Sequence, residues 1–356
     1  MTASSRRRVL KIVLFSIAGI CALMLLASLI LWGVAMPVRN LPEPTGPYTV
    51  GTVAYDLIDY DRPEAYSLSE PFGARTIRMR LWYPADAREP ANATGADVRV
   101  APWMVDGREH VRGIVASHGF PWFVWDHTVL MQSNSYPSAT VAEPAVFDSQ
   151  HAAERLPVVL ISHGWRGYAG LHADVAEELS SHGYVVAAPT HSYGAAAVLL
   201  DDDRMLRARE EILPDRNEAP DFLERAGLLV ETFARDNAFV LDHLEAVQAG
   251  AAAHDAGVSP ATLSGARGRR PGGVAEFDVA GTLEQLAGRL DLDRVAVVGH
   301  STGGGAMVEF ALSEPRVAAL VGLDAWVEPI GREELMTDAL RVPSLLLRSE
   351  EWEGGI

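Results

Sequence analysis

The chain has 356 residues, enough for one large α/β domain or two small ones. Its 30 basic and 47 acidic residues give a formal net charge of −17, which argues against nucleic acid as a partner. The only cysteine, Cys21, excludes a disulfide framework, a CxxC redox site and a thiolate metal cluster.

The N-terminus combines a basic stretch with a long apolar segment. Four basic residues within positions 1–11 precede residues 12–36, which carry no charge and are long enough to cross a bilayer. Only Arg39 follows closely, so the positive-inside rule places 1–11 in the cytoplasm and the rest of the protein outside. We therefore expect a single-pass signal anchor. The alternative is a cleaved signal peptide, with "GVA" at 33–35 as its cleavage site.

A domain is expected to follow this segment. Residues 37–48 are rich in proline and should form a linker to a domain at 49–356. The first strand expected there is 76–84, where apolar residues alternate as they do in a half-buried antiparallel strand.

Further along the domain, buried strands and helical patterns alternate. Strands are expected at 156–162, 184–189, 295–298, 317–323 and 342–348. Helices are expected with Leu171, Val175 and Leu179 on one face, at 221–248, at 283–290 and directly after Ser301. This order predicts a mostly parallel sheet with helices on both faces, preceded by antiparallel strands at one edge. Functional residues of such a sheet lie at the carboxyl ends of its strands.

Two polar segments are expected to be surface loops. Residues 201–216 are acidic and arginine-rich, and residues 257–273 are rich in glycine. The three aspartates at 201–203 are interpreted as part of a charged loop rather than as a ligand set. No glycine-rich phosphate loop opens a helix elsewhere, so we expect neither a metal ion nor a cofactor.

The sequence "RVAVVGHSTGGGAM" at 294–307 places a serine between an apolar strand and a helical apolar pattern. Ser301 lies between Gly299 and Gly303, as in the G-x-S-x-G nucleophile elbow. In such an elbow the serine occupies a strained turn, and the residues two before and two after it must be small. We therefore predict that Ser301 is a nucleophile rather than a serine that caps a helix.

The surroundings of this serine resemble a known family. The segments that carry the resemblance are "DRVAVVGHSTGG" (293–304), "LVGLDAWVEPIG" (320–331), "EFDVAGTLEQL" (276–286), the stretch 158–191 and the "LWYP" strand. They resemble the plasma-type platelet-activating factor acetylhydrolases and their bacterial relatives, which are serine esterases of the α/β-hydrolase fold. "LDAW" is the most specific of these motifs, and the resemblance runs from about residue 50 to the end.

The resemblance implies which residue is the triad acid. In the family it is the "LDAW" aspartate, here Asp324, whose role is to accept the imidazole N–H and stabilise the imidazolium. Glu350 or Glu351, after the strand at 342–348, is the rival acid, because other α/β hydrolases place theirs there.

An oxyanion hole needs two backbone N–H groups aimed at the developing alkoxide. One is expected from Thr302, directly after the nucleophile, and the family's other donor corresponds to Trp165. A second Ser-His-Gly sequence offers Phe120 as an alternative, but its continuation at 121–127 suits a packed aromatic segment. His163 is expected to pack behind the loop that carries Trp165.

The triad histidine is not assigned. In the family it follows the acid on a later loop, and none of the 11 histidines here lies after His300. His300 is expected to point into the fold, and His191 is a weaker substitute. Two explanations stay open: a C-terminally truncated chain that lacks the end of the fold, or a natural protein without hydrolytic power.

The expected function is hydrolysis of carboxylic esters through an acyl-enzyme on Ser301. The resemblance implies short-chain or phospholipid-type esters as substrates, held near the membrane by the N-terminal anchor. The alternatives are a general short-chain or polyester esterase, and an inactive membrane-anchored binding protein with the same fold.

Overall fold

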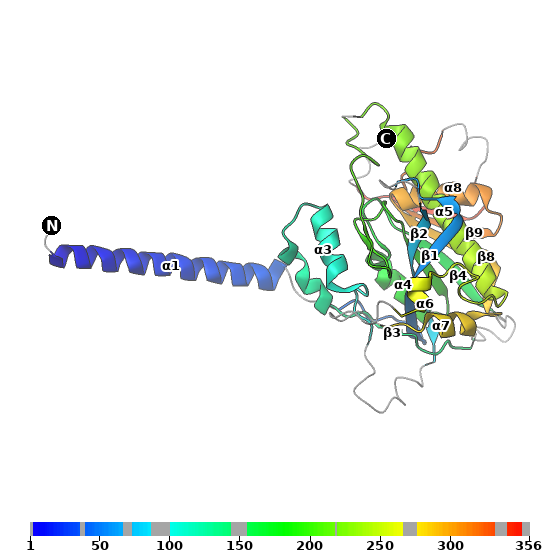
Figure 1. Ribbon diagram of the computed structural model, residues 1–356, viewed down its shortest axis with the longest axis horizontal. Helices are drawn as coiled ribbons and strands as arrows, with labels where there is room; N and C mark the ends of the chain where they lie inside the picture. The colour runs from blue at the N-terminus through cyan, green and yellow to red at the C-terminus, as the bar shows by residue number, and fades with distance from the viewer. Residues whose placement is uncertain are drawn as a thin grey trace. The chain divides into compact units, whose positions relative to one another are not determined.

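The computed structural model describes residues 3–35, 40–66, 73–86, 100–143, 155–217, 219–265, 276–331 and 340–350. The chain forms two compact units, Met1–Arg39 and Asn40–Ile356. The first unit is the helix α1, Ala3–Ala35 (Figure 1). Within it, residues 8–30 are long and apolar enough to span a membrane, a property that signal sequences share. The helix thus begins well before the apolar segment predicted at 12–36 and includes the basic residues.

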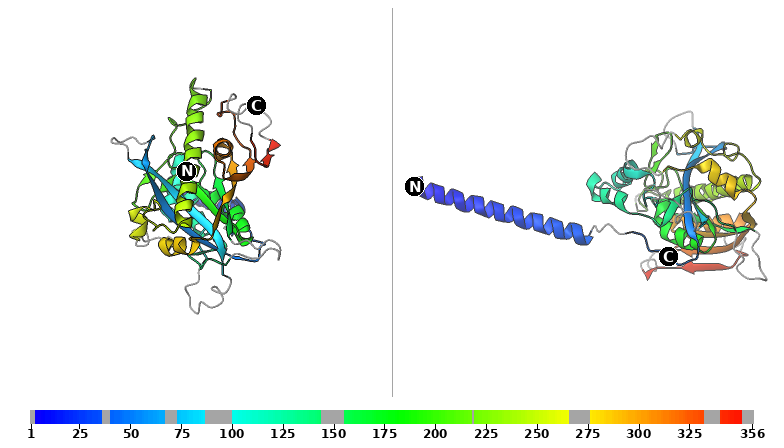
Figure 2. Two further views of the ribbon diagram at one scale, coloured as in Figure 1. Left: turned by 90° about the vertical axis from the view of Figure 1, so that its right-hand side faces the viewer. Right: turned by 90° about the horizontal axis from the view of Figure 1, so that it is seen from below.

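The second unit contains a mixed sheet whose eight described strands follow the order β10-β9-β8-β4-β5-β2-β1-β3 (Figures 1 and 2). The strands are β1 Thr49–Pro63, β2 Ala74–Ala85, β3 Ser135–Pro137, β4 Leu156–Ser162, β5 Val185–Thr190, β8 Leu290–His300, β9 Val317–Leu323 and β10 Ser344–Leu347. β2 pairs antiparallel with both β1 and β5, and the pairs from β5 to β10 are parallel. The predicted sheet, with antiparallel strands before a parallel part, is confirmed.

Helices cover this sheet on both faces, as predicted. The helices are α3 Gly107–Ser117, α4 Ala173–Ser181, α5 Phe222–Gln248, α6 Pro260–Leu263, α7 Val279–Leu286 and α8 Thr302–Ser313, with short 3-10 turns η1 Trp122–Val124, η2 Asp126–Leu130 and η3 Ala169–His172. Leu160 of β4 packs in one core with Phe233 of α5 and Met307 of α8. Val159, its neighbour in β4, packs in the other core with Ala176 of α4. Successive residues of β4 face opposite cores, which explains why its sequence is continuously apolar.

The strand predicted at 76–84 is β2, but the expectation that it is half-buried was wrong. Every residue after the first in β2 is buried, including its arginines. Arg78 donates hydrogen bonds to Asp56 at 3.0 Å, Asp201 at 2.9 Å and Asp106 at 3.1 Å. Burying a guanidinium is costly unless its charge is compensated, as these three carboxylates do for Arg78. Arg78 is therefore part of an interior ion cluster rather than of a solvated face.

Both segments predicted as surface loops are partly structured. Asp201 is buried beside Arg78, and the short strands β6 Val198–Leu199 and β7 Met205–Leu206 form a hairpin around it. In the segment predicted at 257–273, Val258 is buried and bridges to β1, and α6 follows directly. Residues 266–273 lie outside the described part of the chain. Both segments are rich in polar residues, but each contacts a strand that is distant in the sequence: Arg78 of β2 for the first and Leu57 of β1 for the second.

The face predicted for the helix after β4 was wrong for two of its three residues, although Leu179 packs against the core. Leu171 lies in η3 rather than in α4, and both Leu171 and Val175 are exposed. The residues that α4 buries are small or polar, among them Ala173, Ala176 and Glu177. Small residues allow α4 to lie close to the sheet, so apolar spacing alone selected the wrong side of this helix.

Candidate active site

Ser301 lies in a sharp turn between β8 and α8. β8 ends at His300, α8 begins at Thr302, and Ser301 has φ 50° and ψ −119°. A positive φ is costly for a residue with a side chain, by about 1–3 kcal/mol, and such residues cluster at functional sites. The Ser301 side chain makes no capping hydrogen bond to α8. The alternative interpretation of Ser301 as a helix cap is therefore wrong.

The two glycines that flank the turn are required by close backbone approach. A Cβ added at Gly299 would lie 2.3 Å from the carbonyl oxygen of Gly303. A Cβ added at Gly303 would lie 2.4 Å from the carbonyl oxygens of both Ser162 and His163. No side chain fits at such distances, because backbone atoms cannot move aside as a flexible side chain can. Close backbone contacts therefore explain why the positions two before and two after Ser301 must be glycine in this chain.

Asp324 directly follows β9, the strand that pairs with β8. The Ser301 N–H donates to the carbonyl of Leu323 at 2.9 Å, and the Trp326 N–H donates to the carbonyl of Ser301 at 2.9 Å. The backbone segments that carry Ser301 and Asp324 are therefore hydrogen-bonded to each other on both sides of the aspartate. Asp324 itself has φ 47°, so it also occupies a strained turn.

The Asp324 carboxylate is held from the far side by the chain after β10. Its Oδ1 accepts a hydrogen bond from the Ser349 N–H at 2.6 Å. This backbone hydrogen bond lowers the pKa of Asp324 below its ordinary value. Glu350, the rival acid, is exposed beside this contact, and Glu351 lies outside the described residues. The carboxylate of Asp324 is thus fixed and ionised.

The loop after β4, residues 163–167 and here called the β4 loop, lies against the nucleophile. A Cβ added at Gly164 would lie 3.0 Å from the Cβ of Ser301. The N–H groups of Trp165, in this loop, and of Thr302, at the start of α8, have no backbone acceptor in the described part of the chain. The structure brings both predicted oxyanion donors to the turn that carries Ser301.

Phe120, the alternative donor, has no such position. It follows α3 instead of a strand of the sheet, and 55% of it is exposed. Trp122 and Phe123 are exposed as well, at 57% and 60%, whereas Trp125 packs against a core cluster. The expectation of a packed aromatic segment is therefore met at Trp125 only.

The histidines near the turn are arranged differently from the expectation. His300 is exposed rather than pointing into the fold, and its ring centroid lies 6.1 Å from that of His172. His191 is fully buried and bonded to Ser162 and Asp236, at 2.9 Å and 2.8 Å. Within the described residues, none of the histidines has a hydrogen bond to Ser301. His163, the first residue of the β4 loop, is buried, as predicted.

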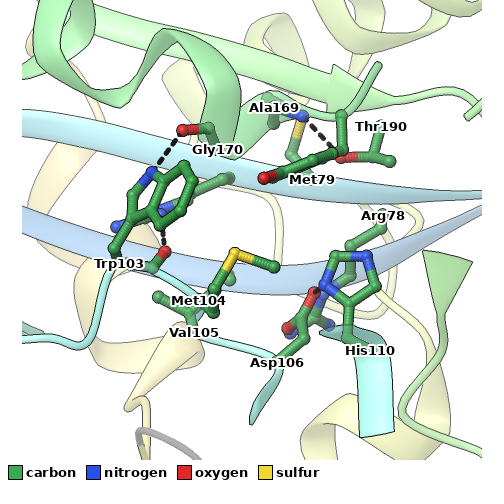
Figure 3. A pocket seen from close by; sticks show the side chains of 13 residues that line it. Arg78, Met79, Trp103, Met104, Val105, Asp106, His110, Ala169, Gly170 and Thr190 are labelled. Carbon is green, nitrogen blue, oxygen red and sulfur yellow. Dashed lines mark hydrogen bonds and ion pairs between the residues drawn. The ribbon is translucent and has the colours of Figure 1, made fainter. Parts of the chain in front are cut away.

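A small cavity lies beside the segment that follows the β4 loop rather than at Ser301 (Figure 3). Trp103 and Gly170 line it together with residues of β2 and α3. The Trp103 Nε1–H donates to the Gly170 carbonyl at 2.7 Å, and the Ala169 N–H donates to the Thr190 hydroxyl at 3.1 Å (Figure 3). These two bonds fix the chain directly after the β4 loop.

One group of polar residues was not found from the sequence. Ser162, His191 and Asp236 form a buried chain of hydrogen bonds next to the β4 loop. Their separations of 29 and 45 residues match no local motif. The only signal is positional, since Ser162 ends β4 and His191 directly follows β5.

Comparison with known proteins shows to which family the chain belongs. Residues 34–354 match the family model described as platelet-activating factor acetylhydrolase, isoform II. The chain belongs to this family. The platelet-activating factor acetylhydrolase of Bos taurus is 23% identical over 337 residues, and that of Canis lupus familiaris is 24% identical over 317 residues. Each match covers 88% of this chain and 61% of the relative, so the chain spans about three fifths of their length.

A solved structure agrees on the fold. The ferulic acid esterase from Streptomyces cinnamoneus superimposes with a TM-score of 0.54 and 20% sequence identity, over 87% of this chain and 76% of that one. The second unit therefore shares its α/β fold, with a mostly parallel mixed sheet, with this esterase. The family resemblance stated from the sequence is confirmed by the family model. At 20% sequence identity the match supports the shared fold but gives no information about the substrate.

Proposed function

We propose that this chain is a serine carboxylic-ester hydrolase that acts through an acyl-enzyme on Ser301. The observation that carries the proposal is the Ser301 turn, whose positive φ places a serine where β8 meets α8. A serine that caps no helix and yet holds a strained conformation is typical of a nucleophile elbow. Membership of the acetylhydrolase family supports the same reaction.

In this mechanism the Ser301 hydroxyl attacks the ester carbonyl and the N–H groups of Trp165 and Thr302 stabilise the oxyanion. Each such donor contributes about 10²–10³-fold to the rate. Asp324 orients and stabilises the histidine that takes the serine proton. That histidine is not identified in the described part of the chain, so the proton acceptor stays unassigned.

The substrates we propose are esters with short acyl groups, including those of phospholipids. The acetylhydrolase names of the relatives and the apolar helix α1 support this choice. We further propose that residues 12–36 form a signal anchor, with residues 1–11 cytoplasmic, a linker at 37–48 and the hydrolase domain on the outer side. The four-to-one excess of positive charge before the span supports that orientation.

The deciding experiment measures hydrolysis of p-nitrophenyl acetate and of an acetylated glycerophospholipid by the full-length protein and by Ser301→Ala. We expect the variant to lose at least about 10³-fold in kcat while its fold is retained. Ser264→Ala, which removes an exposed serine with one local hydrogen bond, is the matched control. Equal turnover by wild type and Ser301→Ala would refute the proposal, and a wild type without turnover would favour the inactive binding protein. Hydrolysis of the soluble ester alone would favour a general esterase.

A further inference from the structure

A hydrogen-bonded chain of a serine, a histidine and an aspartate lies in the interior, behind the proposed site. Ser162 Oγ is 2.9 Å from His191 Nε2, and His191 Nδ1 is 2.8 Å from Asp236 Oδ2. All three residues have zero exposure. They come from the end of β4, the end of β5 and the middle of α5, so the chain links three elements beneath the β4 loop.

Asp236 anchors this buried chain because two arginines compensate its charge. Arg75 donates two hydrogen bonds to the carboxylate, at 3.0 Å and 2.6 Å, and Arg62 donates a third at 2.6 Å. Burial opposes ionisation, but the Arg75 guanidinium and the hydrogen bonds from His191 and Arg75 hold the pKa of Asp236 well below its ordinary value. Since an ionised carboxylate only accepts, His191 Nδ1 carries the proton and donates to Asp236. His191 Nε2 then accepts from the Ser162 hydroxyl.

The buried serine is not a second nucleophile. Ser162 is fully buried, and its carbonyl oxygen would lie 2.4 Å from a Cβ at Gly303, so the elbow covers it. Any influence of this chain on an ester must therefore pass through the backbone around it.

The backbone N–H of His191 connects this hydrogen-bonded chain to His163. The His191 N–H donates to His163 Nε2 at 3.1 Å. A backbone N–H can only donate, so Nε2 is unprotonated and the proton of the neutral ring sits on Nδ1. Burial and the neighbouring His191 keep the pKa of His163 well below its ordinary value, which keeps the ring neutral. His163 Nδ1 then donates to the Gly164 carbonyl at 2.7 Å.

The Gly164 carbonyl belongs to the same peptide unit as the Trp165 N–H. The Gly167 N–H also donates to this carbonyl, at 2.8 Å, so two donors fix its direction. In a planar trans peptide the N–H points opposite to the C=O. Whatever holds the Gly164 carbonyl therefore also aims the Trp165 N–H, and hydrogen bonds to the carbonyl polarise that N–H.

We propose that His163, held in its Nδ1–H tautomer by the backbone N–H of His191, is a positioning residue that aims the Trp165 N–H at the substrate oxyanion. The inference rests on the proposed function, because it assigns a task within the Ser301 reaction. His163 does not touch the ester; it acts through the Gly164–Trp165 peptide.

The kinetic test compares substitutions at two buried histidines that both donate Nδ1–H to a backbone carbonyl. His243 does so to Ala256 at 2.6 Å, away from the β4 loop, and serves as the matched control. His163→Leu should lower kcat for p-nitrophenyl acetate by about 10–100-fold with little change in KM, less than the loss of a whole oxyanion donor. His163→Asn places an amide donor near the Nδ1 position and should restore most of kcat. His243→Leu and His243→Asn should keep kcat at temperatures where they are folded.

The outcomes separate the two claims. If Ser301→Ala keeps the activity, the proposed function fails and the positioning role fails with it. If Ser301→Ala is inactive while His163→Leu keeps wild-type kcat, or His163→Asn loses as much as His163→Leu, only the positioning role fails.

A second measurement needs no turnover. In the full-length protein labelled with ¹⁵N-histidine and held in detergent, the His163 ring should show the Nδ1–H tautomer, assigned by its loss in His163→Asn. An Nε2–H tautomer or a protonated ring at pH 7 would overturn the inference, because neither could accept from the His191 N–H and donate to Gly164.

Discussion

The carbonyl of Ser301 accepts a hydrogen bond from the N–H of Trp326 at 2.9 Å, which joins the turn after β8 to the loop after β9. A Cβ at Gly305, one turn into α8, would lie 2.1 Å from the Trp326 carbonyl, so the two segments touch along their backbones. The proposed nucleophile and acid are thus carried by one hydrogen-bonded backbone unit. Their spacing does not depend on side-chain packing alone.

Asp324→Asn should lower kcat for ester hydrolysis by about 10³–10⁴-fold, because an amide cannot hold the histidine tautomer or stabilise the imidazolium. Glu350→Gln removes the rival acid and should leave kcat near the wild-type value. Steady-state kinetics of both variants on p-nitrophenyl acetate decide between the two carboxylates. The reverse pattern would assign the acid to the position after β10.

Gly303→Ala should destabilise the fold by about 1–3 kcal/mol or more, since its Cβ would overlap the carbonyl oxygens of Ser162 and His163. Gly73→Ala is the control, because a Cβ there meets nothing within 4 Å. Thermal unfolding should show a lowered Tm for Gly303→Ala alone. A Gly303→Ala variant as stable and active as Gly73→Ala would contradict the close approach described here.

His243 should make stability depend on pH. Burial lowers its pKa to about 4, so between about pH 6.5 and pH 4 the unfolded chain binds a proton that the folded chain does not. Its contribution to stability is therefore complete above pH 6.5 and decreases by about 3 kcal/mol as the pH falls to 4. Urea unfolding of His243→Leu between pH 7 and pH 5 should show a slope reduced by up to about 1.4 kcal/mol per pH unit relative to the wild type. The same substitution at exposed His254 should leave the slope unchanged, and an unchanged slope in His243→Leu would refute the prediction.

Removal of residues 1–39 should release the second unit, residues 40–356, from membranes. We expect the full-length protein to sediment with membranes and to resist extraction by high salt, because α1 presents a long uncharged surface. The variant that begins at Asn40 should be found in the soluble fraction and hydrolyse p-nitrophenyl acetate at the wild-type rate. An N-terminal tag should stay membrane-bound in the full-length protein. Loss of the tag, with a soluble product that begins near Met36, would identify a cleaved signal peptide instead.

The sequence predicted the sheet well because its central strands are buried on both faces. The strand at 317–323 coincides with β9, and the helix at 221–248 with α5 to within one residue. Long apolar runs and repeated helical spacing are local signals that tertiary contacts reinforce. Phe233 of α5 is fully buried in the core between this helix and the sheet.

Two of the wrong predictions, for the segment around Asp201 and for the buried face of α4, concern sites where polar or small residues are buried in place of apolar ones. Asp201 was assigned to a solvated loop because its neighbours are charged, yet it is buried against Arg78. No local feature of the sequence indicates an ion-pair partner that lies 123 residues away. Ser301 was easier to predict, because an elbow is built from residues adjacent in sequence. The support behind the β4 loop is built across strands and could not be found in this way.

The Arg78 cluster also bears on how the second unit, Asn40–Ile356, opens. Asp56, Asp106 and Asp201 come from β1, the start of α3 and the β6–β7 turn, and all three meet one guanidinium. If any one of these segments came loose alone, it would leave the remaining buried charges without a full set of counter-ions, at a free-energy penalty of several kcal/mol. Partial opening is thus disfavoured at each of the three places, and we expect the amide hydrogens of these three segments to exchange with solvent as a single cooperative unit.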